Sequence, residues 1–496
     1  MKDCLIGLDI GTTGTKALLI DIHGKILASS YRSYRCENRK PGYSEQDARD
    51  WWKAACETVR ECCEKSERGN DVAAISLSTQ GGTFVPVDAS GNPLKAAVLW
   101  NDTRCWAEKE ETALTLGEQY IYDTTGWSLC DSMNAMQILW MKKHEPEMFG
   151  RVAKFLSVPD YMTGKMTGRY AVDLSNGGIN QMVNITAGEW DDKILSFLGV
   201  SGNQLPDVVP SGEMAGTLTK DAARELGLRK GVPVISGGHD QYCVALGAGA
   251  IESGDVVIGT GTAWVVTAIT DAPCISGAQR SRHTVRGKWG ELLSVITGGA
   301  CLEWLRKNIC PLSGGEPLPF DEINDHVKKI EAGADGMTFY PYLAGAPYPL
   351  TRSDFRGAFT GLDLAHGKYH MARAVMEGVA YQIAWILETF RLAGYKMKEI
   401  KILGGASKSD VWTQIIADIT GVPLLVPQVA DIACVGAAVL AGVGCGLFHS
   451  FREGTEALAA DFCHISPGRN ARVYPALFEK FKDHAAAAGG LDKLTV

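Results

Sequence analysis

The stretch GLDIGTTGTKALLIDIHGK at residues 7–25 sets a turn rich in glycine and threonine between two apolar segments. Residues 4–10, 16–21 and 25–31 each have the apolar pattern of a strand, and His23-Gly24 is a further turn signal. The pattern predicts an antiparallel meander. A turn of this composition exposes consecutive backbone N–H groups without Cβ atoms in the way, and its hydroxyls add donors. It can therefore surround a phosphate without any net positive charge.

This turn leads into a strand, whereas a Walker loop, G-x-x-x-x-G-K-[ST], leads into a helix. A single copy is also consistent with a glycine-rich hairpin that binds nothing. The same device recurs at residues 255–266, DVVIGTGTAWVV, where an apolar strand, a Gly/Thr turn and an apolar strand follow one another again. Two copies predict two related domains, 1–245 and 246–496, that face each other and offer one loop each to a shared cleft.

The rest of the chain alternates helix and strand patterns, which indicates an α/β fold. Asp47 is the expected N-cap of a helix over 48–67. Further helices are predicted over 369–392 and 409–420, with a strand at 398–405 between them. The longest apolar stretch, residues 432–448, consists mostly of Ala, Gly and Val. We expect a buried helix there, whose small residues let a neighbouring backbone come close, and no membrane span.

Composition narrows the partners and the compartment. The chain of 496 residues has 46% hydrophobic and 21% charged residues and a net charge of −8 without a basic run, which argues against nucleic acid as a partner. Its 14 cysteines include no C-x-x-C pair, so neither a zinc site nor a disulfide framework is expected. The N-terminal residues lack a signal-peptide pattern, so a cytoplasmic location with reduced thiols is expected.

Asp9 adds a chemical constraint to the first turn. It comes just before the predicted phosphate loop, and a carboxylate beside a phosphate is repelled unless a cation lies between them. Mg²⁺ is the expected cation.

A longer segment carries a family resemblance. GAFTGLDLAHGKYHMARAVMEGVAYQ at residues 357–382 resembles the signature of the FGGY carbohydrate kinases, and two opposed hairpins in a duplicated α/β chain resemble the actin, heat-shock ATPase and sugar kinase superfamily. The resemblance also takes in residues 42–52, 97–104, 237–241, 403–412 and 436–446. It implies two actin-like (ribonuclease H-like) domains with mixed sheets flanked by helices, an interdomain cleft, and ATP-dependent phosphorylation of a sugar.

The resemblance also implies residue roles. The aspartate of the G-G-x-D segment, Asp240, would be the general base that takes the proton of the sugar hydroxyl, and Asp9 would hold Mg²⁺ largely through water. The nucleotide would be bound by Gly11, Thr12 and Thr13, by Gly259, Thr260 and Thr262, by Gly404, Gly405 and Ser409, and more weakly by Gly298 and Gly299. The sugar would be bordered by Gln80, Gly81, Gly82, Trp100, Asn101 and Asp102. Gly261 stands where the family usually has serine, and Gln137 stands where it usually has lysine.

Several of these residues have alternatives from sequence. Asp240 precedes an apolar helix and could be only its N-cap. Trp100 ends an apolar run and could belong to the core. His239 is expected to face solvent or to make a local hydrogen bond rather than to take the proton. Glu377 could cap a helix or pair across an interdomain hinge.

The acceptor is the least determined feature. After Leu77-Ser78-Thr79, xylulokinases typically carry Gln-Met-His and glycerol kinases Gln-Arg-Glu, but this chain has Gln80-Gly81-Gly82-Thr83. The missing Arg-Glu pair argues against glycerol, because its hydroxyls would lack partners. A ketopentose is the first expectation and another sugar or polyol the second. An ATP-binding conformational switch without sugar turnover, or a kinase that binds without turnover, remain as alternatives. The oligomeric state is open, with a homodimer among the states the sequence allows.

Overall fold

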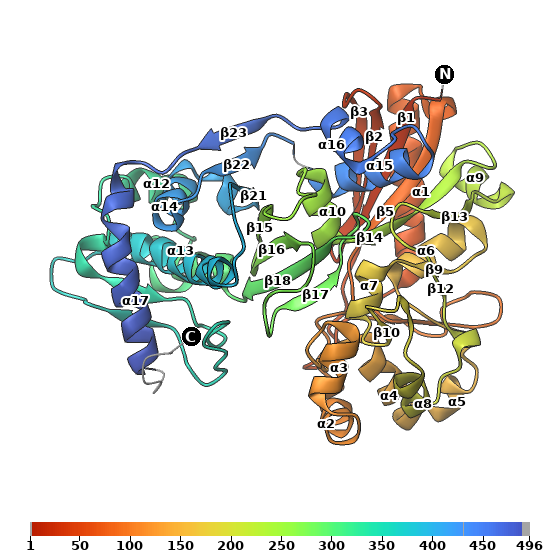
Figure 1. Cartoon of the computed structure of the whole chain (residues 1–496), viewed down its shortest axis with the longest axis horizontal. Helices are drawn as coiled ribbons and strands as arrows, with labels where there is room; N and C mark the ends of the chain where they lie inside the picture. Colours follow the sequence, from red (N-terminus) through yellow and green to blue (C-terminus); the bar gives the residue numbers. More distant parts are fainter. Residues whose placement is uncertain (1, 430, 489–496) are drawn as a thin grey trace.

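Two large mixed sheets, each flanked by helices, form the molecule (Figure 1). The structure is a computed structural model and describes residues 2–429 and 431–488. The first sheet has the strand order β13-β14-β5-β1-β2-β3, and the second has the order β17-β18-β16-β15-β21-β22-β23. The α/β class and the two-domain architecture predicted from the sequence are confirmed.

The first sheet begins with the predicted meander. β1 (Cys4–Ile10), β2 (Gly14–Asp21) and β3 (Ile26–Ser33) pair antiparallel in sequence order. β5 (Val72–Thr79) runs parallel to β1, and β14 (Pro233–His239) runs parallel to β5. β13 (Met214–Thr217) closes the edge antiparallel to β14.

The second sheet repeats this order. β15 (Val256–Thr260), β16 (Trp264–Thr270) and β18 (Trp289–Val295) form an antiparallel meander, and β21 (Ile400–Gly404) and β22 (Leu424–Pro427) continue it as parallel strands. β23 (Phe462–Ile465) closes one edge antiparallel, and β17 (Gln279–Arg282) is added at the other. Each half therefore places a meander beside two parallel strands and an antiparallel edge, as a duplicated fold would.

One face of the first sheet is covered by α1 (Ala48–Ser66), α6 (Val158–Thr167) and α9 (Lys220–Leu226). Asp47 caps α1 as predicted, because its side chain accepts a hydrogen bond from the Arg49 N–H. Trp51 and Tyr161 are completely or almost completely buried in this core, where each large apolar side chain contributes about 1.5 to 3 kcal/mol. The predicted helix thus forms because one face of it is apolar and its first turn is capped.

The other face of the first sheet is covered by α10 (Asp240–Gly247) and α15 (Ile432–Gly444), which also pack on each other. A Cβ at Gly7 would lie 1.9 Å from the Cys434 carbonyl oxygen, and a Cβ at Gly436 would lie 1.9 Å from the Cys243 carbonyl oxygen. The prediction of a buried small-residue helix is confirmed. Within residues 2–429 and 431–488, no helix is both long and apolar enough to cross a bilayer.

The two halves of the chain are not separated at a single point. α15 comes from the second half but lies on the first sheet, and α10 spans the predicted boundary between residues 245 and 246. Figure 1 shows α10 between β14 of the first sheet and β15 of the second. The boundary itself stays a prediction.

The second sheet is covered mainly by the long helix α13 (Lys368–Leu392), with α14 (Asp410–Thr420) beside it. Glu377 on α13 accepts hydrogen bonds from the Gly333 N–H, Arg373 and the Tyr474 hydroxyl. It therefore pairs inside the second half rather than across a hinge. The other helices of this half are α11 (Gly298–Trp304), α12 (Phe320–Val327), α16 (Phe451–Ala457) and α17 (Tyr474–Ala488).

A helical region with its own core is inserted between β5 and β14. It contacts the second half directly, because the Gly126 carbonyl accepts from the Arg280 N–H and the Trp127 indole donates to Ser281 Oγ at 2.8 Å. Its helices are α2 (Trp106–Thr115), α3 (Glu118–Thr125), α4 (Asn134–His144), α5 (Pro146–Phe149), α7 (Leu174–Ile179) and α8 (Asp192–Leu198). The remaining strands are β4 (Glu45–Gln46), β6 (Val85–Val87), β7 (Ala97–Val98), β8 (Lys154–Leu156), β9 (Ala171–Val172), β10 (Val183–Asn184), β11 (Glu189–Trp190), β12 (Asp207–Val208), β19 (Thr338–Tyr340) and β20 (Ala358–Thr360).

Candidate active site

Asp9 lies near the end of β1, just before the first Gly/Thr turn. Its Oδ1 accepts a hydrogen bond of 2.8 Å from Ser78 Oγ on the neighbouring strand β5. Burial, and next the negative charge of Asp240, raise the pKa of Asp9 to about 6. The charge of Asp240 therefore acts on Asp9. The start of α10 thus lies within electrostatic range of the end of β1.

Asp240 is the first residue of α10, and His239 occupies the N-cap position without a side-chain capping bond. The interpretation of Asp240 as a mere N-cap is therefore wrong. Its Oδ1 is buried and has no hydrogen-bond partner among the described residues, although His239 Nε2 lies 3.3 Å away. The N-terminus of a helix favours the ionised form of a carboxylate. Asp240 thus presents a carboxylate oxygen without a hydrogen-bond partner in the described part of the chain, directly after the end of β14.

His239 is buried, with 6% of its surface exposed, so the expectation that it faces solvent is wrong. Its ring packs edge-on against Trp127 and lies near Tyr242. Its Nδ1 has no hydrogen-bond partner in the described part of the chain.

Thr12 connects the first loop to two of the predicted sugar residues. Its hydroxyl donates to Gln80 Oε1 at 2.9 Å and accepts from Trp100 Nε1 at 3.0 Å. Trp100 is 44% exposed, so the alternative that it belongs to the core is wrong. Thr13 next to it is exposed, and Gly11 closes the turn by donating its N–H to the Gly14 carbonyl.

Gly81 and Gly82 connect Trp100 to His239. A Cβ at Gly81 would lie 2.7 Å from His239 Cδ2, and a Cβ at Gly82 would lie 2.7 Å from Met133 Sδ and 3.3 Å from Trp100 Cβ. Gly82 also has φ of +68°, which a glycine adopts without strain. The structure thus brings Thr12, Gln80, Gly81, Gly82, Trp100, His239 and Asp240 together in one continuous set of contacts.

Asp102 does not join this group. Its carboxylate accepts from the Ser44 N–H at 2.7 Å and from the Arg104 guanidinium, and it is 1% exposed. The expectation that Asp102 borders the sugar is corrected, because both of its carboxylate oxygens are occupied by hydrogen bonds from Ser44 and Arg104. Asp102 instead stabilises the segment that carries Trp100. Asn101 is exposed beside Trp100. Gln137 is buried and donates to the Leu99 and Ser132 carbonyls, so it supports the same segment through Leu99.

Thr260 in the second hairpin is turned toward its own half. Its hydroxyl donates to the Leu403 carbonyl at 2.6 Å and accepts from the Ala406 N–H, and its carbonyl accepts from the Gly405 N–H. Thr260 is 3% exposed, and these hydrogen bonds link β15 to the turn after β21. Its hydroxyl proton is therefore used inside the second half, and the expected place of Thr260 in the phosphate loop stays a prediction that concerns its backbone.

A cavity of about 730 Å³ opens beside this hairpin. Among the residues predicted to bind nucleotide, those lining it are Thr260, Thr262, Gly299, Gly405 and Ser409. Gly298 packs on Trp264, and Gly404, with φ of +99°, packs on the Thr260 carbonyl, so both shape the wall from behind. Gly259 lies in β15, and a Cβ there would be 3.7 Å from Gln241 Oε1, which places the second hairpin next to the start of α10.

Part of this cavity was not predicted from the sequence. Ser409 Oγ donates to Asn324 Oδ1 on α12 at 2.8 Å, and Trp412 lines the opposite part of the wall. The other lining residues not predicted are Gly261, Trp264, Ala300, Leu302, Glu303, Phe320, Asp321, Met376, Ala406 and Lys408. The amphipathic segment that forms α12 was the available signal, but nothing local shows that it packs beside α14.

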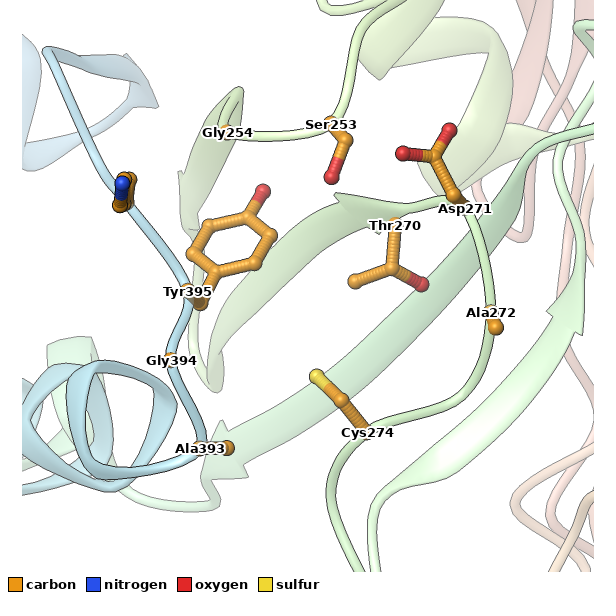
Figure 2. A pocket seen from close by; sticks show the side chains of 10 residues that line it. Ser253, Gly254, Thr270, Asp271, Ala272, Cys274, Ala393, Gly394 and Tyr395 are labelled. Carbon is orange, nitrogen blue, oxygen red and sulfur yellow. The ribbon is translucent and has the colours of Figure 1, made fainter.

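A second cavity of about 400 Å³ lies at the other end of β15 and β16 (Figure 2). It is bounded by Ser253 and Gly254 before β15, by residues 270–274 after β16, and by residues 393–396 after α13. The Tyr395 hydroxyl donates to the Asp255 and Ile269 carbonyls and closes one wall. None of the predicted site residues lines this cavity. Among residues 2–429 and 431–488, no cluster of three or more His, Cys, Asp or Glu side chains could hold a metal by itself.

Comparison with known proteins gives two family matches. The model of the FGGY family of carbohydrate kinases, N-terminal domain, matches residues 4–247, and that of the C-terminal domain of the same family matches residues 255–445.

Individual relatives match over nearly the whole chain. A xylulose kinase of Bacillus subtilis is 30% identical over 484 residues, which cover 97% of this chain and 96% of that protein. The crystal structure of the xylulose kinase from Rhodospirillum rubrum is 26% identical with a TM-score of 0.90, and 98% of each chain is covered. The crystal structure of the gluconate kinase from Lactobacillus acidophilus has the same identity, TM-score and coverage.

Proposed function

This chain belongs to the FGGY family of carbohydrate kinases, and from that premise we propose that it transfers the γ-phosphate of ATP to a hydroxyl of a ketopentose, with xylulose as the first acceptor. As a member of the family it is an ATP-dependent sugar kinase. The observation that carries the proposal is the position of Asp240. It acts electrostatically on Asp9 of the first loop, and its neighbour Gln241 lies beside Gly259 of the second.

Asp240 is the proposed general base. Its buried Oδ1 lacks a hydrogen-bond partner among the described residues, so it is available to accept the proton of the attacking hydroxyl. A carboxylate is a weak base, but phosphoryl transfer passes through a loose transition state with little deprotonation of the nucleophile. Most of the acceleration then comes from positioning and from charge stabilisation by the loop donors.

Mg²⁺ is the proposed companion of ATP, and the site fits it. Burial and Asp240 raise the pKa of Asp9, and its nearest cation, Lys16, pairs with Asp431 at 2.8 Å. The carboxylates of Asp9 and Asp240 would thus gain from a divalent cation. Because no cluster in the described chain could hold a metal alone, Asp9 would bind it mainly through water and the phosphates. When bound, Mg²⁺ neutralises developing charge on the phosphates.

For the nucleotide, we propose that the cavity at the second hairpin takes the adenosine and that both hairpins donate backbone N–H groups to the phosphates. Gly299, Gly405 and Ser409 line the adenosine part, and Thr262 lies between it and the phosphates. Gly11, Thr13 and Gly259 remain the loop residues proposed to contact phosphate. Thr12 acts on the acceptor side through Gln80 and Trp100.

A neutral sugar suits the acceptor side better than a sugar acid. Two carboxylates, Asp9 and Asp240, lie at the reacting end, and a carboxylate on the acceptor would be repelled there unless a cation faced it. Gluconate is therefore the second candidate, supported by similarity to gluconokinases in sequence and to a gluconate kinase in structure.

The test is ADP release by the purified chain with Mg·ATP and a panel of xylulose, ribulose, fructose, glycerol and gluconate. We expect xylulose to give the highest kcat/KM. If none of the acceptors raises ADP release above background, the proposal of sugar turnover falls and an ATP-binding switch replaces it. A highest kcat/KM for gluconate would overturn the ketopentose assignment alone.

Three further features stay proposals. They are a domain boundary between residues 245 and 246, a cytoplasmic location, and a homodimer as a possible assembly. Limited proteolysis, cell fractionation and light scattering test them in turn.

A further inference from the structure

Three of the residues that the structure brings together, Gln80, His239 and Asp240, each have a polar atom without a hydrogen-bond partner among the described residues. Gln80 Nε2, His239 Nδ1 and Asp240 Oδ1 are all buried, and no described residue hydrogen-bonds to them. Gln80 is 2% exposed and His239 is 6% exposed. A buried polar group without a hydrogen-bond partner lowers the stability of the fold by about 1 to 3 kcal/mol. Three such groups in neighbouring residues therefore indicate a site that a polar ligand can occupy.

The imidazole of His239 occupies the space that Gly81 leaves open. A Cβ at position 81 would lie 2.7 Å from Cδ2 and 3.0 Å from Nε2 of this ring. The His239 backbone N–H donates to Ser175 Oγ at 2.8 Å, and the ring packs edge-on against Trp127. The His239 ring therefore fills the space that a side chain at position 81, in the loop after β5, would otherwise occupy.

From this arrangement we propose that His239 binds the acceptor sugar and selects for a hydroxyl on the carbon next to the one that is phosphorylated. The inference rests on the proposed kinase function. His239 Nε2 lies 3.3 Å from Asp240 Oδ1, a separation comparable with that of two oxygens on neighbouring carbons of a polyol. An imidazole has at least one N–H donor in either protonation state, so it can bind a hydroxyl while Asp240 accepts the proton of the next one.

For a 2-ketopentose the inference names the hydroxyl that His239 binds. The primary hydroxyl on C1 adjoins a carbonyl, while the one on C5 adjoins the C4 hydroxyl. With transfer to the C5 hydroxyl, His239 therefore binds the C4 hydroxyl. NMR of the product identifies the phosphorylated carbon.

The decisive experiment combines a substrate change with a residue change. kcat/KM is measured for xylulose and 4-deoxyxylulose with the wild type, His239→Ala and His239→Gln. We expect the missing hydroxyl to lower kcat/KM about tenfold in the wild type and less than twofold in His239→Ala, mostly through KM, with His239→Gln in between. Such a cycle isolates the contact from general damage to the fold.

Two controls separate the contact from a structural effect. His283→Ala removes another buried imidazole, from the other side of Tyr242, and should leave the ratio between the two sugars unchanged. Gly81→Ala should displace the ring and reproduce the loss of discrimination, whereas the same change in a His239→Gly background should have little effect. This pair keeps the inference testable if His239→Ala folds poorly.

Equal losses for xylulose and its deoxy analogue in His239→Ala would overturn the inference and leave the kinase function intact. Product phosphorylated at C1 would overturn it as well. Failure of the wild type to phosphorylate any acceptor would instead overturn the proposed function, so the two failures are distinguishable. Calorimetric titration of xylulose without ATP gives a second readout, in which His239→Ala should weaken sugar binding about tenfold.

Discussion

The two Gly/Thr hairpins share a backbone plan but differ in what surrounds them. In the first hairpin Asp9 lies two residues before Gly11, and in the second hairpin Val257 occupies the equivalent position before Gly259. The Thr12 hydroxyl is bonded to Gln80 and Trp100 on the acceptor side, and the Thr260 hydroxyl is bonded to the turn after β21 beside the nucleotide cavity. Both hairpins thus expose backbone N–H groups, but only the first has a carboxylate, Asp9, directly before its turn. The proposed acceptor side thus lies in the first half and the proposed adenosine site in the second, with the phosphates between the two hairpins.

The sharpest test of this division is Asp240→Asn. Asparagine keeps the size of the side chain but cannot take the proton, so we expect kcat to fall about 10²- to 10⁴-fold. Nucleotide binding, measured by calorimetry, should be unchanged because the cavity lies in the other half. Asp221→Asn, another aspartate in the first turn of a helix but exposed, is the matched control. Activity within threefold of the wild type would mean that the base is misassigned.

The carboxylate of the first hairpin should lower the stability of the ligand-free protein. The folded-state pKa of Asp9 is about 6, above its ordinary value of 3.8. Its contribution to stability is therefore fully present at low pH and is lost as the pH rises through 6. Asp9→Asn, which can still accept from Ser78, should be more stable than the wild type at pH 7 to 8 by about 2 to 3 kcal/mol.

Urea denaturation of both proteins from pH 4 to pH 8 measures this difference. It should shrink toward zero near pH 4, and Asp221→Asn should show no such trend. The more stable Asp9→Asn variant should also lose activity, because the site gives up stability for function. A wild type that is the more stable protein at pH 8 would contradict the raised pKa.

The second hairpin is sensitive to its packing rather than to charge. A Cβ at Gly299 would lie 2.2 Å from the Gly261 carbonyl oxygen, so Gly299→Ala must displace the hairpin at the proposed nucleotide cavity. We expect KM for ATP to rise about tenfold, equivalent to about 1.4 kcal/mol, with KM for the sugar unchanged. Gly314→Ala, where the added Cβ meets nothing within 4 Å, is the control. An equal rise in both KM values would show that the halves are not separated in this way.

Local chemistry predicted most of the fold and only part of the site. The meander, the Asp47 cap and the helix that starts after Ser409 depend on residues close in sequence, and they are confirmed. The bracing role of Asp102 depends on Ser44, 58 residues away, and that of Thr260 depends on Leu403, 143 residues away. The burial of His239 likewise depends on a glycine on another strand's loop. Partners of this kind are set by the tertiary fold, so spacing along the chain could not identify them.

The smallest expected effect gives the most direct contrast between the hairpins, because Thr12 and Thr260 occupy equivalent positions in the repeat. Thr12→Val removes the hydroxyl that joins Gln80 to Trp100, and we expect KM for the sugar to rise threefold to tenfold while KM for ATP stays the same. Thr260→Val removes the hydroxyl that joins β15 to the turn after β21, and KM for ATP should rise instead. Each variant serves as the control of the other, since both exchange a hydroxyl for a methyl at matched sites. If both variants raised the same KM, the hairpins would act as one nucleotide clamp, and the acceptor side would have to be assigned to residues other than those Thr12 contacts.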